Sequence, residues 1–145
     1  MENGIEFRHV ETDSDMERSF AVMRELRPHI ASAEQFVERV RRQQAGGYFL
    51  LAAWTQGEVV GLAGYRHLEN LIYGAFTYVD DLVVRPTSQR GNIGGRLLDE
   101  VRQKAKTADS VMLVLDTGLG NAFAQRFYFR QGLLSRGLHF SQVLS

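Results

Sequence analysis

The chain has 145 residues, and 17 basic residues balance 17 acidic ones. Hydrophobic residues make up 44% and charged residues 23%, which is typical of a globular domain and excludes a disordered chain. Nothing resembles the basic excess of a nucleic-acid-binding protein, and the longest apolar stretch, Tyr48–Trp54, is too short to span a membrane. Because no cysteine is present, disulfides and thiolate metal sites are excluded, and we expect a cytoplasmic protein without a metal.

The first part of the chain has one strand pattern followed by two helix patterns. Residues 5–10 alternate apolar and polar side chains, which predicts a strand. Residues 12–27 begin with several helix-capping side chains and end before a proline, which predicts a helix. Residues 32–45 predict a second helix, since they begin with a serine and two glycines follow.

The middle of the chain is dominated by strand patterns. Residues 48–54 and 59–65 are apolar runs on either side of a Gln-Gly turn, which predicts a hairpin. A loop is expected over residues 69–74, followed by a long strand over residues 76–84. Pro86 ends that strand, because a proline cannot donate a hydrogen bond within a central sheet.

The last part alternates helices and strands. A helix is expected from about Gly94, then a short strand over residues 111–115 that is apolar enough to be buried on both faces. A helix over residues 121–130 and a final alternating strand over residues 138–143 complete the chain. The order β-α-α-β-β-β-α-β-α-β predicts a mixed sheet covered on both faces.

The segment between residues 79 and 98 carries the clearest functional signal. A strand ends there at a proline turn, and a glycine-rich loop leads directly into a helix. Loop amides and the positive end of a helix dipole bind anions in this arrangement, and a pyrophosphate is the expected ligand. The glycine spacing matches neither a Rossmann fingerprint nor a P-loop, and no lysine follows the loop.

This segment resembles the acetyl-CoA loop of the GNAT superfamily of N-acetyltransferases. The match is Gln89-Arg90-Gly91-Asn92-Ile93-Gly94, with Asn92 in place of the first glycine of the family pattern. Asparagine tolerates a left-handed backbone better than most residues, so we expect the loop to keep its shape. A second match covers residues 121–133, where Asn121, Tyr128 and a following glycine have the family spacing and a leucine replaces the usual phenylalanine.

The resemblance implies an α/β (α+β) fold with a single domain over residues 5–143. It implies a mixed, mostly antiparallel sheet of about six or seven strands with about four flanking helices. The fourth and fifth strands would splay around acetyl-CoA, and strand backbone would hydrogen-bond its pantetheine arm. The residues that the resemblance assigns to acetyl-CoA are Leu82, Val83, Val84, Gln89, Arg90, Gly91, Asn92, Ile93, Gly94, Gly95 and Asn121.

The resemblance also implies direct transfer of an acetyl group to a primary amine. The Tyr128 hydroxyl would protonate the leaving thiolate, and a backbone N–H near Val83 would polarise the thioester carbonyl. Strict strand alternation places Asp80 and Asp81 on opposite faces, and Asp80 is the expected base, acting through water. The structural alternative is that both carboxylates pair with arginines such as Arg66.

Two other functions remain open: a non-catalytic acyl-CoA-binding or regulatory module of the same fold, and a nucleotide-binding half-domain. The acceptor would be a small-molecule or peptide amine, a cationic one if Asp80, Asp81 and Glu69 lie near the cleft. Asp81, His67, His139 and Glu69 are further candidates for proton transfer. A homodimer is possible by resemblance. An apolar stripe of the second helix would border the acceptor site: Phe36, Val37 and Val40.

Overall fold

A computed structural model describes residues 4–89 and 91–145, in two compact units that span residues 1–114 and 115–145 and are described separately. The first unit contains β1 (Glu6–His9), α1 (Asp13–Leu26), α2 (Ala33–Ala45), β2 (Tyr48–Thr55), β3 (Glu58–Asn70), β4 (Gly74–Val84), a 3-10 helix (Pro86–Ser88), α3 (Ile93–Thr107) and nearly all of β5 (Met112–Leu115). The second unit contains α4 (Ala122–Arg130). The sheet has the order β1-β2-β3-β4-β5, which confirms a mixed α/β fold.

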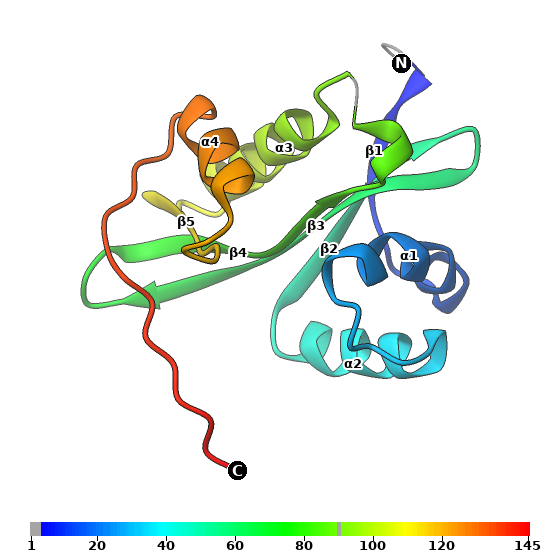
Figure 1. The fold of residues 1–145 in the computed structure, drawn as a ribbon, viewed down its shortest axis with the longest axis horizontal. Helices are drawn as coiled ribbons and strands as arrows, with labels where there is room; N and C mark the ends of the chain where they lie inside the picture. The colour runs from blue at the N-terminus through cyan, green and yellow to red at the C-terminus, as the bar shows by residue number, and fades with distance from the viewer. Residues whose placement is uncertain (1–3, 90) are drawn as a thin grey trace. The chain divides into compact units, whose positions relative to one another are not determined.

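The strands from β1 to β4 form an antiparallel meander (Figure 1). The β3–β4 hairpin continues past the end of β2, whose first residue, Tyr48, pairs with Arg66. At the hairpin tip the Asn70 side chain accepts hydrogen bonds from the backbone N–H groups of Ile72 (3.0 Å) and Tyr73 (2.8 Å). The loop is therefore shorter than the predicted residues 69–74, because one side chain closes the turn.

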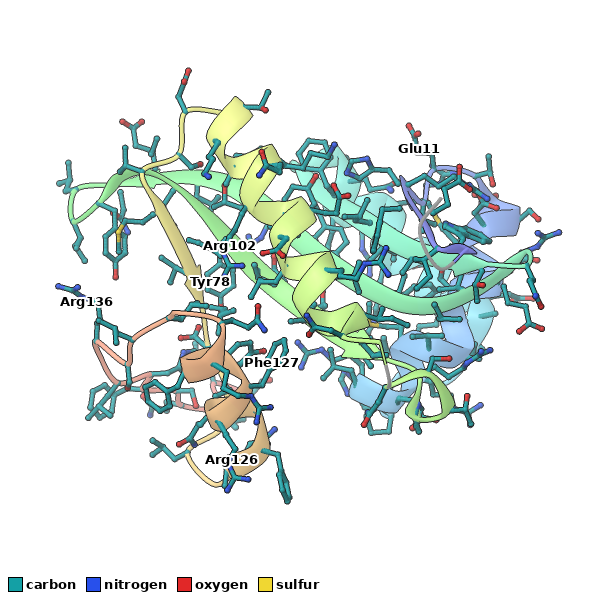
Figure 2. The ribbon with its side chains drawn as sticks, turned by 90° about the horizontal axis from the view of Figure 1, so that it is seen from above. Glu11, Tyr78, Arg102, Arg126, Phe127 and Arg136 are labelled. Carbon is teal, nitrogen blue, oxygen red and sulfur yellow. The ribbon has the colours of Figure 1, made fainter. Side chains whose placement is uncertain are left out.

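Helices cover both faces of this sheet, as the element order predicts. Figures 1 and 2 show α1 and α2 on one face and α3 on the other. The core between the sheet and the first two helices includes the fully buried Met16, Phe36 and Leu62. On the opposite face α3 lies directly against β3, since a Cβ atom at Gly61 would lie 2.9 Å from Leu97 Cδ1. The first unit thus has a separate apolar layer on each side of its sheet.

The predicted starts of the first two helices are confirmed by their caps. The Thr12 hydroxyl accepts a hydrogen bond from Asp15 N–H, and the Ser32 hydroxyl accepts one from Gln35 N–H, both at 3.1 Å. These bonds satisfy amides that the helices leave unpaired. Within residues 4–89 and 91–145, no helix has the length and apolar composition that crossing a membrane requires.

Two predictions for the end of the chain are wrong. Residues 138–143 form no strand in the described structure, so the sheet has five strands rather than six or seven. Leu138 and Phe140 are 69% and 86% exposed, and alternation alone cannot form a strand that has no neighbour to pair with. The prediction that β5 is buried on both faces is also wrong, because β5 lies at the sheet edge and all four of its residues are only half-buried.

Candidate active site

A β-bulge in β4 determines how the two adjacent aspartates are presented. Val79 pairs with Tyr65 and Asp81 pairs with Gly64, so Asp80 is an extra residue in β4. A bulge of this kind interrupts the alternation of side chains along a strand. As a result Asp80 and Asp81 both line one cavity, and the prediction that they point to opposite faces is wrong. The sequence of a single strand does not show where its pairing register shifts.

The cavity lies within the first unit and has a volume of about 280 Å³. Further polar side chains of the lining come from several parts of the chain: Arg27 at the end of α1, His29 between α1 and α2, Arg39 and Gln43 of α2, Tyr48 of β2 and Tyr78 of β4. The apolar stripe of α2 was expected to border the acceptor site, and two of its members, Phe36 and Val40, line this cavity. The cavity therefore combines a polar wall with an apolar floor, as small-molecule sites commonly do.

Asp81 is held by two side chains from other elements. Arg27 Nε donates a hydrogen bond to Asp81 Oδ1 at 3.0 Å, and the Tyr48 hydroxyl donates one to Oδ2 at 2.7 Å. Burial, and then the nearby Asp81 carboxylate, raise the pKa of Tyr48 well above its ordinary value, so the hydroxyl keeps its proton. Asp81 is therefore a paired charge that links α1, β2 and β4.

Asp80 forms a bidentate ion pair with Arg66, the arginine expected as its partner if the carboxylate has a structural role. Arg66 Nε and Nη2 donate to the two carboxylate oxygens at 2.9 and 2.8 Å, and Arg27 Nη2 donates to the Asp80 backbone carbonyl at 2.8 Å. Burial raises the pKa of Asp80, and the Arg66 guanidinium opposes this shift in part. A raised pKa suits a base, while the ion pair fixes the orientation of the carboxylate.

A glycine in β3 makes room for this network. A Cβ atom at Gly64 would overlap the Tyr48 hydroxyl and would lie 2.7 Å from Asp81 Oδ2. We expect Gly64→Ala to lower the free energy of unfolding by about 1–3 kcal/mol in urea denaturation, because the added methyl displaces buried groups. The control is Gly46→Ala, whose new methyl would meet only the Gln43 carbonyl at 3.5 Å. Equal stabilities of the two variants would contradict this packing.

The glycine-rich loop leads into α3 with a left-handed backbone. Gly91 has φ +86°, and Asn92 has φ +56° and ψ +39°, so the asparagine adopts the conformation expected of it. Gln89 follows the 3-10 helix at the start of the loop. Arg90, which was assigned to the cofactor, lies outside the described residues.

The first turn of α3 has the features of an anion site. The first hydrogen bond of the helix runs from Arg96 N–H to the Asn92 carbonyl at 3.0 Å, so the N–H groups of Ile93, Gly94 and Gly95 precede it. Asn92 makes no side-chain cap, and the first turn contains no acidic residue, unlike those of α1 and α2. No acidic side chain of the first turn therefore neutralises the positive end of the helix dipole.

The end of β4 directs backbone groups away from β3. The Arg85 N–H donates to the Val60 carbonyl at 2.8 Å, and the register pairs Leu62 with Val83 two residues earlier. Since hydrogen-bonded pairs alternate along antiparallel strands, the N–H of Val83 faces β3. The amide groups of Leu82 and Val84 face the other way. These two residues, and not Val83, can thus offer backbone hydrogen bonds to a ligand.

The second unit carries the other two predicted site residues. Asn121 caps α4, and its side-chain oxygen accepts a hydrogen bond from Ala124 N–H at 3.1 Å. Tyr128 is half-buried, with its ring 5.4 Å from that of Phe127. Burial raises the pKa of Tyr128, so its hydroxyl is protonated at neutral pH, as a general acid requires. His139, a further candidate, is exposed and lies 3.5 Å from Asp116.

The remaining proton-transfer candidates do not belong to the cavity lining. His67 Nδ1 lies 2.8 Å from the Thr77 hydroxyl, and Glu69 is exposed near the end of β3. Sequence reasoning did not identify the roles of Arg27 and Tyr48, although both hold Asp81. No local motif marks them, because they approach the aspartate only through the packing of α1 and β2 against β4.

Known proteins identify the class to which this fold and loop belong. The sequence model of the acetyltransferase (GNAT) family matches residues 10–133, and the chain belongs to this family. It is 36% identical over 64 residues to an IAA acetyltransferase of Azospirillum brasilense, covering 44% of this chain and 42% of that protein. It is 30% identical over 94 residues to the aminoalkylphosphonate N-acetyltransferase of Salmonella typhimurium, covering 63% and 60%. The chain thus matches less than two thirds of either relative.

Solved structures share the fold at low sequence identity. A Trypanosoma brucei acetyltransferase superposes with a TM-score of 0.81 at 19% identity, covering 97% of this chain and 99% of that one. An aminoglycoside acetyltransferase from an uncultured soil metagenomic sample superposes with a TM-score of 0.79 at 16% identity, covering 99% and 98%. These similarities establish the fold and leave the acceptor open.

Proposed function

We propose that the chain is an N-acetyltransferase that uses acetyl-CoA as donor and a primary amine as acceptor. The observation that carries this proposal is the start of α3, where the N–H groups of Ile93, Gly94 and Gly95 follow a left-handed Asn92, precede the first hydrogen bond of the helix and lie in a turn without an acidic residue. Membership of the acetyltransferase (GNAT) family supports the acetyl transfer. The cavity beside Asp80 and Asp81 in the same unit is the proposed acceptor site.

The residues present fit acetyl-CoA as a co-substrate. The N–H groups of Ile93, Gly94 and Gly95 would hold its pyrophosphate, since a helix N-terminus favours a phosphate anion. The backbone groups of Leu82 and Val84 would bond the amides of its pantetheine arm in the manner of an added strand. By resemblance to the family, four further residues would complete the binding site: Gln89, Arg90, Gly91 and Asn121.

Acetyl-CoA supplies an activated acetyl group, and side chains of this chain donate and accept the protons. The neutral amine nitrogen forms a bond to the acetyl carbon as the carbon–sulfur bond breaks. Tyr128 donates the proton that the departing sulfur needs, and its raised pKa keeps that proton available. Asp80 accepts the amine proton through water, which its raised pKa favours, and Arg66 keeps the carboxylate in place.

Binding of CoA tests the foundation of this proposal. A ligand that binds only the folded state stabilises it, by about 2.7 kcal/mol at a concentration one hundred times its Kd. We therefore expect millimolar CoA or acetyl-CoA to raise the Tm and to give saturable heat in calorimetry. NAD and ATP serve as comparison ligands. Tight binding of either one with no binding of CoA would contradict the proposal and favour a nucleotide-binding domain.

A further inference from the structure

The charges of the proposed acceptor cavity do not match an acidic cleft. Asp81 is paired with Arg27 and with the Tyr48 hydroxyl, and Asp80 is paired with two nitrogens of Arg66, Nε and Nη2. Each carboxylate is thus neutralised by an arginine of the protein. A cationic acceptor, which the sequence suggested, would therefore find no uncompensated acidic charge in this cavity.

One further arginine lines the cavity, and it adds a positive charge. Arg39 lies on α2 and is half-buried, and among residues 4–89 and 91–145 it makes no ion pair or side-chain hydrogen bond. Its neighbours on the same helix are different: Arg41 binds Asp13 at 2.6 Å, and Arg42 binds Glu38 at 3.0 Å. Among the described residues, Arg41 and Arg42 of α2 thus have acidic partners, whereas Arg39, the arginine of this helix that lines the cavity, has none.

A half-buried guanidinium without a partner favours an anion from solution. Its planar donors match carboxylate and phosphonate oxygens in a bidentate geometry, and burial strengthens the attraction. The cavity volume of about 280 Å³ is at the lower limit for ligand pockets, so a compact ligand fits better than a large one. The carboxylate oxygens of Asp80 and Asp81 supply hydrogen-bond acceptors for an amine in the same cavity.

We propose that the acceptor is a small amine that also carries a carboxylate or phosphonate group, and that Arg39 binds this anionic group. The inference rests on the proposed function for the acetyl transfer, while the binding step depends only on the cavity of the first unit. Arg39 is a specificity-determining residue that contacts the end of the acceptor away from the amine. Since Arg39 approaches from α2 and the aspartates from β4, the two ends of one short molecule are recognised by different elements.

Calorimetric binding of three amines of similar length tests this inference without requiring turnover. The probes are 3-aminopropanoate, 2-aminoethylphosphonate and n-propylamine, which carries no anion. We expect at least one anionic amine to bind about 10- to 100-fold more tightly than n-propylamine, the usual contribution of a charged hydrogen bond. Arg39→Gln should remove this difference, and Arg39→Lys should restore part of it. Which of the two anionic amines binds better identifies the anion.

The matched control is Arg42→Gln, because Arg42 is an exposed arginine of α2 with its own partner, Glu38. This variant should bind all probes as the parent does. The inference is overturned if n-propylamine binds as tightly as both anionic amines, if none of the probes binds, or if Arg39→Gln keeps the preference. Failure of CoA to bind would instead contradict the proposed function, and Arg39-dependent binding of the anionic amine would still be observable.

Discussion

Replacing Tyr128 with phenylalanine is expected to lower kcat by roughly 10²- to 10⁴-fold, the usual contribution of a positioned general acid. The change keeps the half-buried ring and its packing against Phe127, and it removes only the hydroxyl. Because the proton is needed at the departing sulfur and not in the ground state, the KM for acetyl-CoA should change little. Steady-state kinetics with an acceptor for which chemistry is rate-limiting measure both constants.

The control for this variant is Tyr73→Phe, which removes a hydroxyl at the tip of the β3–β4 hairpin, where the ring packs against Phe76. Its kcat should equal that of the parent protein. If Tyr128→Phe keeps the parental kcat, Tyr128 is not the general acid, and water is left as the proton source. The proposed acetyl-CoA site would be unaffected, since it depends on the start of α3.

Gly94→Val is expected to weaken CoA binding by about 100-fold or more, which corresponds to the loss of one or two charged hydrogen bonds. Each Cα–Cβ bond of an α-helix tilts toward the helix N-terminus, so the valine methyl groups would occupy the space in front of the first-turn amides. Asn92→Gly should keep its affinity, because glycine adopts the same positive φ without strain. Calorimetric titration with CoA gives both affinities.

Gln103→Val is the matched control, because it introduces the same residue at an exposed position farther along α3. It places the same β-branched side chain in α3, at a cost in helix propensity that Gly94→Val does not carry, and it leaves the first turn unchanged. If Gly94→Val binds CoA as tightly as Gln103→Val, the pyrophosphate is not bound by the first-turn amides. Circular dichroism of both variants would show that α3 is retained.

Local signals in the sequence predicted much of the fold and of the anion site. Thr12 and Ser32 mark helix starts because their side chains bond amides within the same turn. Asn92 was expected to adopt a left-handed conformation from its position and residue type alone, and it does. The GNAT resemblance depended on such short-range patterns, and the family match over residues 10–133 confirms it.

The features that sequence reasoning missed depend on how distant segments pack. The bulge at Asp80 is a property of the pairing between β3 and β4, so neither strand shows it separately. Arg27 reaches Asp81 across 54 residues of sequence, and no periodicity predicts such a contact. Residues 138–143 show the opposite case. Their apolar and polar side chains alternate as in a strand, but they pair with no strand in the described structure.

Formation of an N-acetylated product is the most direct test of the proposed activity. The parent protein would be incubated with acetyl-CoA and 3-aminopropanoate, 2-aminoethylphosphonate or n-propylamine, and mass spectrometry would follow the amine while a thiol reagent measured free CoA. We predict that at least one anionic amine is acetylated with stoichiometric release of CoA, and that Tyr128→Phe is much slower. Saturable binding of acetyl-CoA with no acetylation of any of the three amines would contradict an enzymatic function and would favour a non-catalytic acyl-CoA-binding module.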